Sequence, residues 1–314
     1  MPSRYRVEKE RGATTVDIER LRRDLEANNG MPGLEILRPD EVDAAVRIFH
    51  RDGFVVVRDV LTADQVKFLR QGCEREAAEV VAMDPNRDGN RHRNRYSWGG
   101  ASLTNSVLHR EEWVMLVDLP TLNPIVTAIF GSSDYHVRRA AGDFCLPGAM
   151  YQRLHADIGD RVGGFSDPRG ILTIRDLPCP VVCCNFLAQD FTRINGPTRQ
   201  IRGTQNSREK IPELGEEPLW MKYSTVCPAP AGSVVIRDVR AWHGGTPNVS
   251  SEMRAIPNAV FLAPWFHERQ LPAMPREMFD LLSEHGRRIC DSVVADEPLT
   301  TGYTFDPARK KKFA

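Results

Sequence analysis

The sequence predicts a mainly β protein, an antiparallel sandwich or barrel flanked by helices. The main reason is a change in texture near residue 135, after which short β-prone runs alternate with Gly, Pro, Asn and Asp. Before that point, apolar residues recur mostly at helical spacing. The 314 residues contain 41% hydrophobic and 27% charged residues, an ordinary globular composition with enough apolar material for a large core.

The N-terminal part predicts several helices and one strand. Apolar periodicity and polar start signals indicate helices over residues 15–29, 40–52 and 62–81. Gly53 stops the second helix, and the β-rich run 54–57 follows it. Residues 84–94 are polar and predict a loop, whereas 113–130 is apolar but interrupted by Pro120 and Pro124, which predicts two short helices.

The later part predicts strands separated by loops. The expected strands are 135–137, 143–146, 151–155, 181–187, 198–201, 233–236 and 259–262. The polar, glycine-containing stretches 159–178 and 206–218 predict loops at the mouth of the barrel, where substrate selection could occur. A helix over 275–289 is expected near the end.

Charge and cysteine usage narrow the class of partner. Lys plus Arg (42) balances Asp plus Glu (42), so no overall field recruits nucleic acid or an anionic membrane, and a small molecule is the expected partner. Seven scattered cysteines lack paired zinc spacing and predict reduced core thiols. Residues 1–10 are charged and contain no apolar segment, which favours a cytoplasmic protein without signal peptide or membrane span. The N-terminal arm could support a homodimer.

His155 and Asp157 are the first candidate site residues. On a strand, residues two apart point to the same face, so one strand could direct both side chains at one metal ion. An H-x-D triplet also arises by chance, and a surface His beside an acid is the plain alternative. His243 shifts the balance, because it follows a β-prone segment and precedes Gly244 and Gly245, which permit a sharp turn.

Two imidazoles and one carboxylate are the ligand set of a mononuclear non-haem iron site. They occupy one face of an octahedron and leave the other open to substrate and O2. Structural zinc is disfavoured, since a closed zinc site requires four protein ligands and usually includes sulfur. Fe(II) is therefore the expected metal.

Arg254 is the candidate anion-binding residue. It lies eleven residues after His243, with turn-forming residues between them, and should return on a neighbouring antiparallel strand. A buried guanidinium requires an anion, and its planar fork matches a carboxylate. A dicarboxylate cosubstrate would supply one, while a core carbonyl or an acid elsewhere in the chain is the open alternative.

The chain resembles the phytanoyl-CoA dioxygenase-like branch of iron(II)/2-oxoglutarate oxygenases. The resemblance covers most of the sequence and rests on four segments in order, namely residues 49–57 (FHRDGFVVV), 152–157 (QRLHAD), 195–201 (NGPTRQI) and 242–248 (WHGGTPN) followed by Arg254. The sequence departs from the family pattern at residues 202–205, where the family commonly shows a Pro-Gly-Ser-His-like run. That departure leaves the metal set intact.

The resemblance implies a double-stranded β-helix, the jelly-roll or cupin-like core, in a single 2-oxoglutarate oxygenase domain spanning residues 1–314. A helical region over 1–134 would pack on the core, the core with the iron site would occupy 135–268, and a helix and tail would fill 269–314. It assigns Fe(II) to His155, Asp157 and His243. The implied cosubstrates are 2-oxoglutarate and O2, with ascorbate as a supporting reductant.

The resemblance also implies how 2-oxoglutarate is held. Arg254 is assigned to its distal carboxylate, and Gln152 and Thr198 are further candidate contacts. Gln152 would need a local irregularity to reach the site, because strict alternation places it on the other face from His155. Arg95 is a candidate for the other end of the cosubstrate or for the substrate, with Arg93 as an equal rival.

The implied reaction is hydroxylation, or desaturation or rearrangement, at an unactivated C–H bond, with release of succinate and CO2. A small to medium, largely apolar intermediate of secondary metabolism is the favoured substrate, and an acyl-CoA thioester is the alternative. Halogenases of this superfamily replace the metal-binding carboxylate with a small residue, so Asp157 argues against halogenation. A catalytically silent jelly-roll binding protein and a cupin-like metalloenzyme independent of 2-oxoglutarate are the competing hypotheses.

Overall fold

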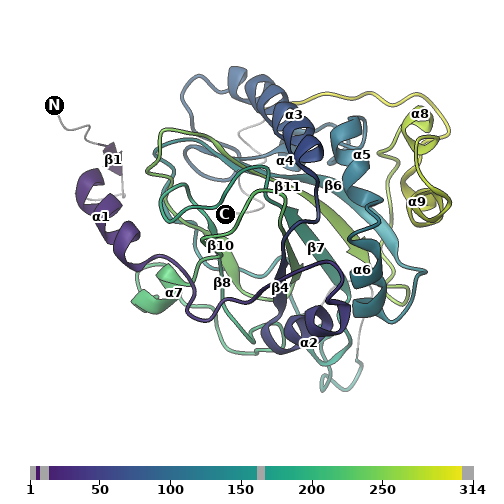
Figure 1. The fold of residues 1–314 in the computed structure, drawn as a ribbon, viewed down its shortest axis with the longest axis horizontal. Helices are drawn as coiled ribbons and strands as arrows, with labels where there is room; N and C mark the ends of the chain where they lie inside the picture. The colour runs from purple at the N-terminus through teal and green to yellow at the C-terminus, as the bar shows by residue number, and fades with distance from the viewer. Residues whose placement is uncertain (1–4, 8–13, 161–166, 306–314) are drawn as a thin grey trace.

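A seven-stranded sheet forms the centre of the computed structural model, which describes residues 5–7, 14–160 and 167–305. Neighbouring strands are antiparallel except for the parallel pair of β3 and β4. In spatial order the strands are β3 (Ile36–Leu37), β4 (Phe54–Val57), β9 (Val234–Asp238), β7 (Val181–Phe186), β11 (Arg254–Leu262), β6 (His136–Cys145) and β5 (Arg95–Ser97). Figure 1 shows this sheet with helices on one side and a small two-stranded ribbon on the other.

On one side of the sheet lies a small ribbon of β8 (Thr198–Gln200) and β10 (His243–Gly245), which pair antiparallel. Single bridges between His155 and His243 and between Arg199 and Thr225 extend the ribbon at both edges. The predicted antiparallel core is confirmed, but the molecule is a mixed α/β structure rather than a mainly β one. The double-stranded β-helix implied by the resemblance stays a prediction.

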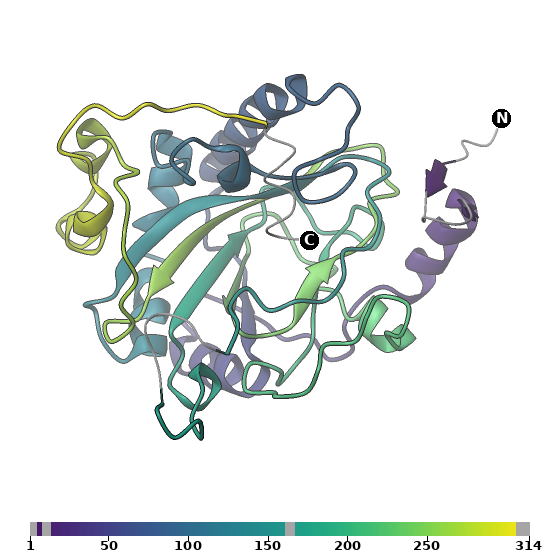
Figure 2. The same ribbon diagram turned by 180° about the vertical axis from the view of Figure 1, so that it is seen from behind.

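Helices cover the opposite side of the sheet, as Figure 2 shows from behind. This layer contains α2 (Val42–Asp52), α3 (Ala63–Ala82), α4 (Trp98–Ala101), α5 (Glu111–Val117) and α6 (Asn123–Phe130), whereas α1 (Ile18–Asn28) lies apart from it (Figure 1). Their ends follow local chemistry. Thr62 and Gln65 form a capping box at the start of α3, and Gly53 ends α2 with a left-handed φ of 81°. The helices predicted over 15–29, 40–52, 62–81 and 113–130 are confirmed.

The main core lies between these helices and the sheet. Leu116 and Ile125, from α5 and α6, are fully buried together with Phe186 and Phe261 from β7 and β11. Burying each such side chain stabilises the fold by about 1.5–3 kcal/mol. This layer holds the sheet rigid, so the strands can serve as a fixed support for groups on the other face.

Three of the predicted strands differ in the structure. Residues 135–137 and 143–146 were expected as separate strands, but β6 is continuous, because ladder bonds to β11 carry it through the Arg and Gly residues at 138–142 that hide the β pattern. Residues 151–155 form no strand. Their backbone instead makes isolated bonds to the β10 strand, from Gln152 N to Gly245 O and from His155 N to His243 O, both 3.0 Å.

The helix predicted over 275–289 is also wrong in detail. It is split into α8 (Arg276–Phe279) and α9 (Glu284–Cys290), followed by the short 3-10 helix η2 (Asp291–Val293). Ser283 breaks the run, because its hydroxyl accepts a hydrogen bond from Gly286 N and caps a new helix. Apolar spacing alone does not reveal this interruption.

The N-terminal region is less purely helical than predicted, since β3, β4 and β5 belong to the large sheet. β1 (Tyr5–Val7) and β2 (Thr14–Val16) form a separate pair. Helix α1 lies at the outer edge next to α7 (Leu219–Tyr223), where the Tyr223 hydroxyl donates to Asp24 Oδ2 at 2.6 Å (Figure 1). The division at residues 134 and 268 stays a prediction.

The two long loops differ in what the structure shows. Residues 206–218 form no helix or strand, as predicted, whereas the loop 159–178 contains the short 3-10 helix η1 (Ile174–Asp176), and its residues 161–166 lie outside the described part. All seven cysteines are unpaired and buried, which confirms the prediction of reduced core thiols. Within the described residues, no helix has the length and apolarity needed to cross a bilayer.

Candidate metal and cosubstrate site

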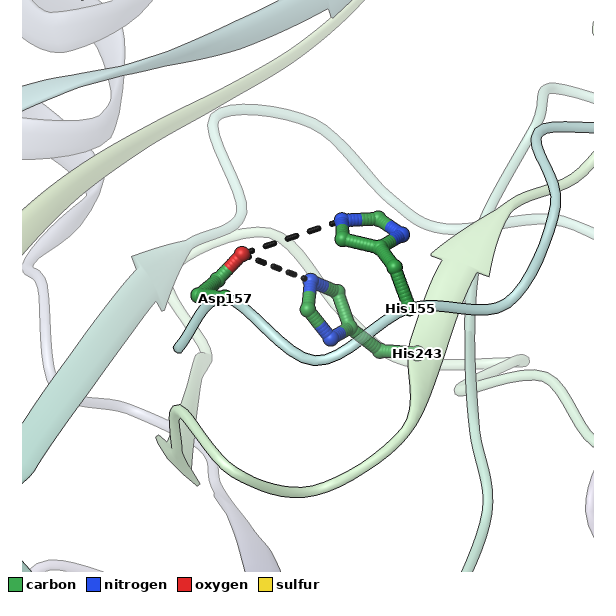
Figure 3. Close-up of side chains that lie close together, drawn as sticks. All are labelled: His155, Asp157 and His243. Carbon is green, nitrogen blue, oxygen red and sulfur yellow. Dashed lines mark ion pairs between the residues drawn. The ribbon is translucent and has the colours of Figure 1, made fainter. Parts of the chain in front are cut away.

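The three predicted metal ligands lie together on the ribbon side of the sheet (Figure 3). His155 and Asp157 come from one irregular segment that bridges to His243, and His243 begins β10. One ligand atom from each residue lies within 4.8 Å of the others. Asp157 Oδ1 is 3.7 Å from Nε2 of His155 and 3.5 Å from Nε2 of His243. Adjacent ligands about 2.1 Å from one ion would be about 3 Å apart, so a small contraction would close the site on a metal.

Both imidazoles are held in the tautomer that a metal requires. Their Nδ1 atoms face main-chain carbonyls, at 3.2 Å from Arg153 O and 3.1 Å from Ala241 O. A carbonyl can only accept, so Nδ1 carries the proton and Nε2 keeps its lone pair. Burial lowers the pKa of His155, and burial together with Arg237 holds the pKa of His243 well below its ordinary value. Both rings are therefore neutral at physiological pH.

Asp157 is held by a residue that the sequence did not single out. Arg237 on β9 donates from Nη2 to Asp157 Oδ2 at 2.7 Å, and its side chain is 3% exposed. Burial would raise the pKa of Asp157, but Arg237 and the two imidazoles outweigh burial and hold that pKa well below the usual range. One carboxylate oxygen is thus taken by Arg237, while Oδ1 faces both imidazoles. A charged residue in the run Val-Val-Ile-Arg-Asp was the available signal, since a buried strand Arg requires an acid.

Arg254, the first residue of β11, is 2% exposed. Its Nε donates to Gly196 O at 2.9 Å, and its guanidinium carbon lies 5.8 Å from the centre of the Phe191 ring. One guanidinium nitrogen, Nε, therefore has a main-chain carbonyl as its partner, which is one of the alternatives to an anion that the sequence left open. Nη1, however, is buried without an acceptor, and among the described residues Arg254 forms no ion pair. A buried guanidinium left in this state fits the carboxylate of a bound molecule.

Thr198 carries a second unpartnered group. Its Oγ1 is buried and has no hydrogen-bond partner among the described residues. On the ribbon, Gly245 pairs with Thr198 and His243 pairs with Gln200, so both β8 side chains lie on the same face as His243. Gln200 Oε1 is likewise buried without a partner. Gln200 was not predicted, although it stands two residues after Thr198 in the same β-prone run.

The other two predicted cosubstrate contacts are engaged with main-chain atoms. Gln152 Oε1 accepts from Gly245 N at 3.2 Å, and the irregular backbone around it is the local departure it would need to reach the site. Arg95 is buried and donates to Met150 O at 2.7 and 2.9 Å and to Thr246 O. Burial lowers the pKa of Arg95 to about 10. Arg93 is exposed, so of the two rivals Arg95 lies inward. A role for Gln152 or Arg95 in cosubstrate binding stays a prediction.

A buried ion pair supports the segment that carries His155. Arg199, on the opposite ribbon face from His243, pairs with Glu217, and neither side chain is exposed. Glu217 also accepts from Leu154 N at 3.2 Å, and Arg199 donates to Gln152 O. These hydrogen bonds connect the loop that precedes α7 to the segment that carries His155 and Asp157, here called the metal segment.

The loop that departs from the family pattern is well anchored. Thr204 Oγ1 donates to Ile201 O at 2.7 Å and accepts from Trp242 N at 2.8 Å, directly before His243. Gln205 Nε2 donates to His50 O at 2.9 Å. The departure at 202–205 therefore keeps a support for the ligand strand.

Comparisons with known proteins agree with this geometry. The sequence model of the family described as phytanoyl-CoA dioxygenase (PhyH) matches residues 49–256, a span that contains the triad and Arg254. The crystal structure of AviO1 from Streptomyces viridochromogenes Tue57 is 21% identical, with a TM-score of 0.50 over 73% of this chain and 97% of that chain. SnoN, a non-haem alpha-ketoglutarate-dependent epimerase from nogalamycin biosynthesis, is 17% identical, with a TM-score of 0.50 over 71% of this chain and 83% of that one.

The structural matches, at these identities, show a shared fold. The family match covers most of the chain and includes every residue of the metal cluster. The family implies Fe(II) and 2-oxoglutarate, and the neutral imidazoles, the ionised Asp157 and the unpaired Arg254 are the groups that both would require. The chain belongs to the phytanoyl-CoA dioxygenase family, and with its intact triad of His155, Asp157 and His243 it is an Fe(II)/2-oxoglutarate oxygenase of that family.

Proposed function

We propose that this oxygenase hydroxylates, desaturates or rearranges an unactivated C–H position of a small to medium, largely apolar molecule. The observation that carries the proposal is that two arrangements occur together. In the first, Nε2 of His155, Nε2 of His243 and Oδ1 of Asp157 converge. In the second, Arg254 is buried and has no acidic partner among the described residues. The first arrangement suits a metal with open positions, and the second suits the distal carboxylate of 2-oxoglutarate.

Each residue has a role that its contacts support. His155, Asp157 and His243 would hold Fe(II), which supplies O2 activation coupled to the conversion of 2-oxoglutarate to succinate and CO2. Arg254 would bind the distal carboxylate, and the Thr198 hydroxyl would donate to it. Gln152 and Arg95 are proposed as further cosubstrate contacts. Arg237 would keep Asp157 bound through a single oxygen, because its own hydrogen bond occupies the other.

The setting that we propose is secondary metabolism. The likeness to SnoN, described as an enzyme of nogalamycin biosynthesis, supports it at the level of fold. Hydroxylation of an acyl-CoA is the alternative that the family description suggests. Halogenation is not proposed, because halogenases of this superfamily lack the metal-binding carboxylate that Asp157 supplies. We further propose that the enzyme acts in the cytoplasm on a small molecule, with ascorbate supporting activity, and that the N-terminal arm contributes to a homodimer.

Anaerobic calorimetry of the iron-loaded protein tests the cosubstrate assignment. Arg254→Met preserves much of the side-chain length and removes the charge, so it should weaken 2-oxoglutarate binding about 100-fold, the loss typical of a buried charge partner. Metal affinity should change by less than about threefold. Arg70→Met, at a half-exposed Arg on α3, serves as the matched control and should change neither value.

Succinate release on adding Fe(II), ascorbate and 2-oxoglutarate to the parent protein separates the enzyme from a silent binding protein. Equal 2-oxoglutarate affinity in parent and Arg254→Met would contradict the assignment. Turnover that is indifferent to 2-oxoglutarate would instead favour a cupin-like metalloenzyme of another class.

A further inference from the structure

Arg139 of β6 lies on the same face of the sheet as the metal ligands. Ladder pairing connects Arg139 to Val260, Val260 to Cys183, and Cys183 to Arg237. Directly paired residues point to the same face of a sheet, so Arg139 shares its face with Arg237, which holds Asp157. The register shift between Val260 and Phe261 leaves Val137 and Phe261 in the helix-covered core instead.

The Arg139 side chain has no partner within the described residues. Its Nε is buried without an acceptor, and no ion pair or side-chain hydrogen bond involves it. The residue as a whole is only partly buried. Burial and Arg138 lower the pKa of Arg139, and Asp157 is among the groups that raise it.

The carboxylates around Arg139 are engaged elsewhere. Asp157 accepts from Arg237 at 2.7 Å, Asp143 lies 3.6 Å from Arg91, and Glu268 lies 2.6 Å from Arg138. A partly buried guanidinium without an acid is unfavourable in the free protein, and a bound anion would offset that cost.

The distal carboxylate of 2-oxoglutarate is a poor fit for this anion. Arg254 pairs with Cys145, at the far end of β6 from Arg139. Six residues of strand separate Cys145 from Arg139, about 20 Å between Cα atoms. A five-carbon dicarboxylate spans less than half of that distance, so one seated on Arg254 reaches Arg139 only if both side chains extend fully toward each other along the strand.

Two amide side chains stand beside Arg139 on the same face. Asn258 and Asn185 are direct cross-strand partners, each two residues from Val260 or Cys183. Asn258 Oδ1 is buried without a partner, and Asn185 Oδ1 accepts only a long contact from Cys183 Sγ at 3.6 Å. Unused amide groups next to an unused guanidinium can bind a molecule that carries both an acid and a hydrogen-bonding group.

We propose that Arg139 binds a carboxylate of the organic substrate, with Asn258 and Asn185 orienting the same molecule. The substrate class is then an organic acid with a mainly apolar skeleton. This inference rests on the proposed function and adds the recognition group that it lacks.

A matched pair of probes tests the inference, cyclohexanecarboxylate and cyclohexanecarboxamide, which differ in charge but hardly in size. Binding to the anaerobic protein, saturated with Fe(II) and 2-oxoglutarate, is followed by ligand-observed NMR. The parent should bind the acid about tenfold or more tightly than the amide, as a charged hydrogen bond predicts. Arg139→Gln should abolish that preference, Arg139→Lys should retain part of it, and Arg138→Gln should leave it unchanged.

Several outcomes would overturn the inference. They are equal or undetectable binding of both probes to the parent at high millimolar concentration, and a preference that survives in Arg139→Gln. A loss of 2-oxoglutarate affinity of about tenfold or more in Arg139→Gln would assign the guanidinium to the cosubstrate instead. If Arg139→Gln fails to fold, Arg139→Lys and Arg139→Met decide the same question. A parent that does not bind 2-oxoglutarate would refute the proposed function itself, whereas normal 2-oxoglutarate binding without acid preference would refute only the role of Arg139.

Discussion

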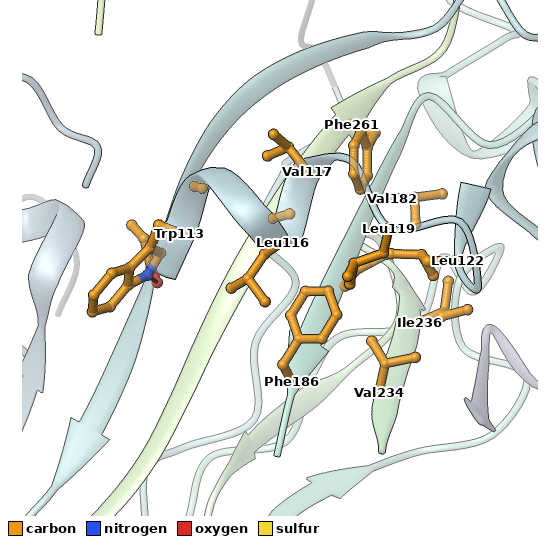
Figure 4. Close-up of a cluster of buried hydrophobic side chains, with 14 of the residues drawn as sticks. Trp113, Leu116, Val117, Leu119, Leu122, Val182, Phe186, Val234, Ile236 and Phe261 are labelled. Carbon is orange, nitrogen blue, oxygen red and sulfur yellow. Dashed lines mark hydrogen bonds between the residues drawn. The ribbon is translucent and has the colours of Figure 1, made fainter. Parts of the chain in front are cut away.

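On β7, Val182, Cys184 and Phe186 point into the helix-covered core, whereas the alternate residues Cys183 and Asn185 point to the face that contacts the metal segment. β9 and β11 repeat this division. Figure 4 shows the first face, where side chains from α5 and the loop after it meet Phe186, Ile236 and Phe261. The second face carries Arg237, Arg254 and Asn258 in the corresponding strands.

The difference shows how a two-residue repeat separates stability from chemistry. The side chains named on the helix face are apolar and buried, so they fix the strands in place. Side chains on the site face include guanidinium and amide groups that have no partner among the residues the structure describes, as with Nη1 of Arg254 and Oδ1 of Asn258. Unsatisfied groups reduce stability, and their concentration on one face indicates a surface built to bind a ligand.

Adjacent substitutions on β7 give the largest expected contrast. Phe186→Ala should lower the free energy of unfolding by about 3–5 kcal/mol, because it opens a cavity in the main core. Asn185→Ala, one residue away on the other face, should cost less than about 1 kcal/mol. Urea unfolding measures both values. Similar losses at the two positions would break the separation of the faces.

Arg237 tests whether the site face orients a metal ligand. Arg237→Met should weaken metal binding about 10–100-fold, since the second oxygen of Asp157 then loses the contact that fixes its direction. Arg237→Lys should recover part of the affinity. Anaerobic calorimetry with Fe(II) provides the measurement. Unchanged affinity in Arg237→Met would show that Arg237 does not orient Asp157 for metal binding.

His243, a residue of the site, should also make the free energy of unfolding depend on pH. The pKa of His243 lies well below its ordinary value in the folded protein, so below about pH 6.5 the unfolded chain binds a proton that the folded chain does not. Stability of the metal-free protein should therefore fall as the pH decreases, by about 1.4 kcal/mol at one unit below that value.

Urea unfolding at two pH values measures this loss. His243→Gln should diminish it, whereas Phe186→Ala should shift stability equally at both pH values. An unchanged pH dependence in His243→Gln would assign the effect to other groups.

Thr198→Val is expected to have the smallest effect. Its hydroxyl has no partner in the described part of the chain, so unfolding should be unaffected, while 2-oxoglutarate affinity should fall about threefold through the loss of one neutral hydrogen bond. Thr246→Val is the matched comparison, because that hydroxyl donates to Pro197 O at 2.6 Å and its loss should reduce stability. Loss of stability in Thr198→Val without any change in cosubstrate binding would make Thr198 a packing residue.

Local patterns predicted much of the fold because their causes are local. The capping box at Thr62 and the left-handed Gly53 act within a few residues, so the limits of α2 and α3 could be predicted. The strand predicted over 151–155 failed for the opposite reason. Those residues obtain their backbone hydrogen bonds from Gly245 and His243, about ninety residues further along the chain.

The sequence by itself predicted the triad of His155, Asp157 and His243, because metal chemistry restricts the residue types, and it indicated Arg254 as a candidate anion-binding residue, because a turn separates it from His243. Only the tertiary structure decided which groups stand around them. The pairing of Arg237 with Asp157 depends on strand register between distant segments. The same register places the buried polar atoms of Thr198, Gln200 and Arg139, which have no partner within the described ranges. Register sets which side chains share a face, and it arises from packing across the whole sheet rather than from any one stretch of chain.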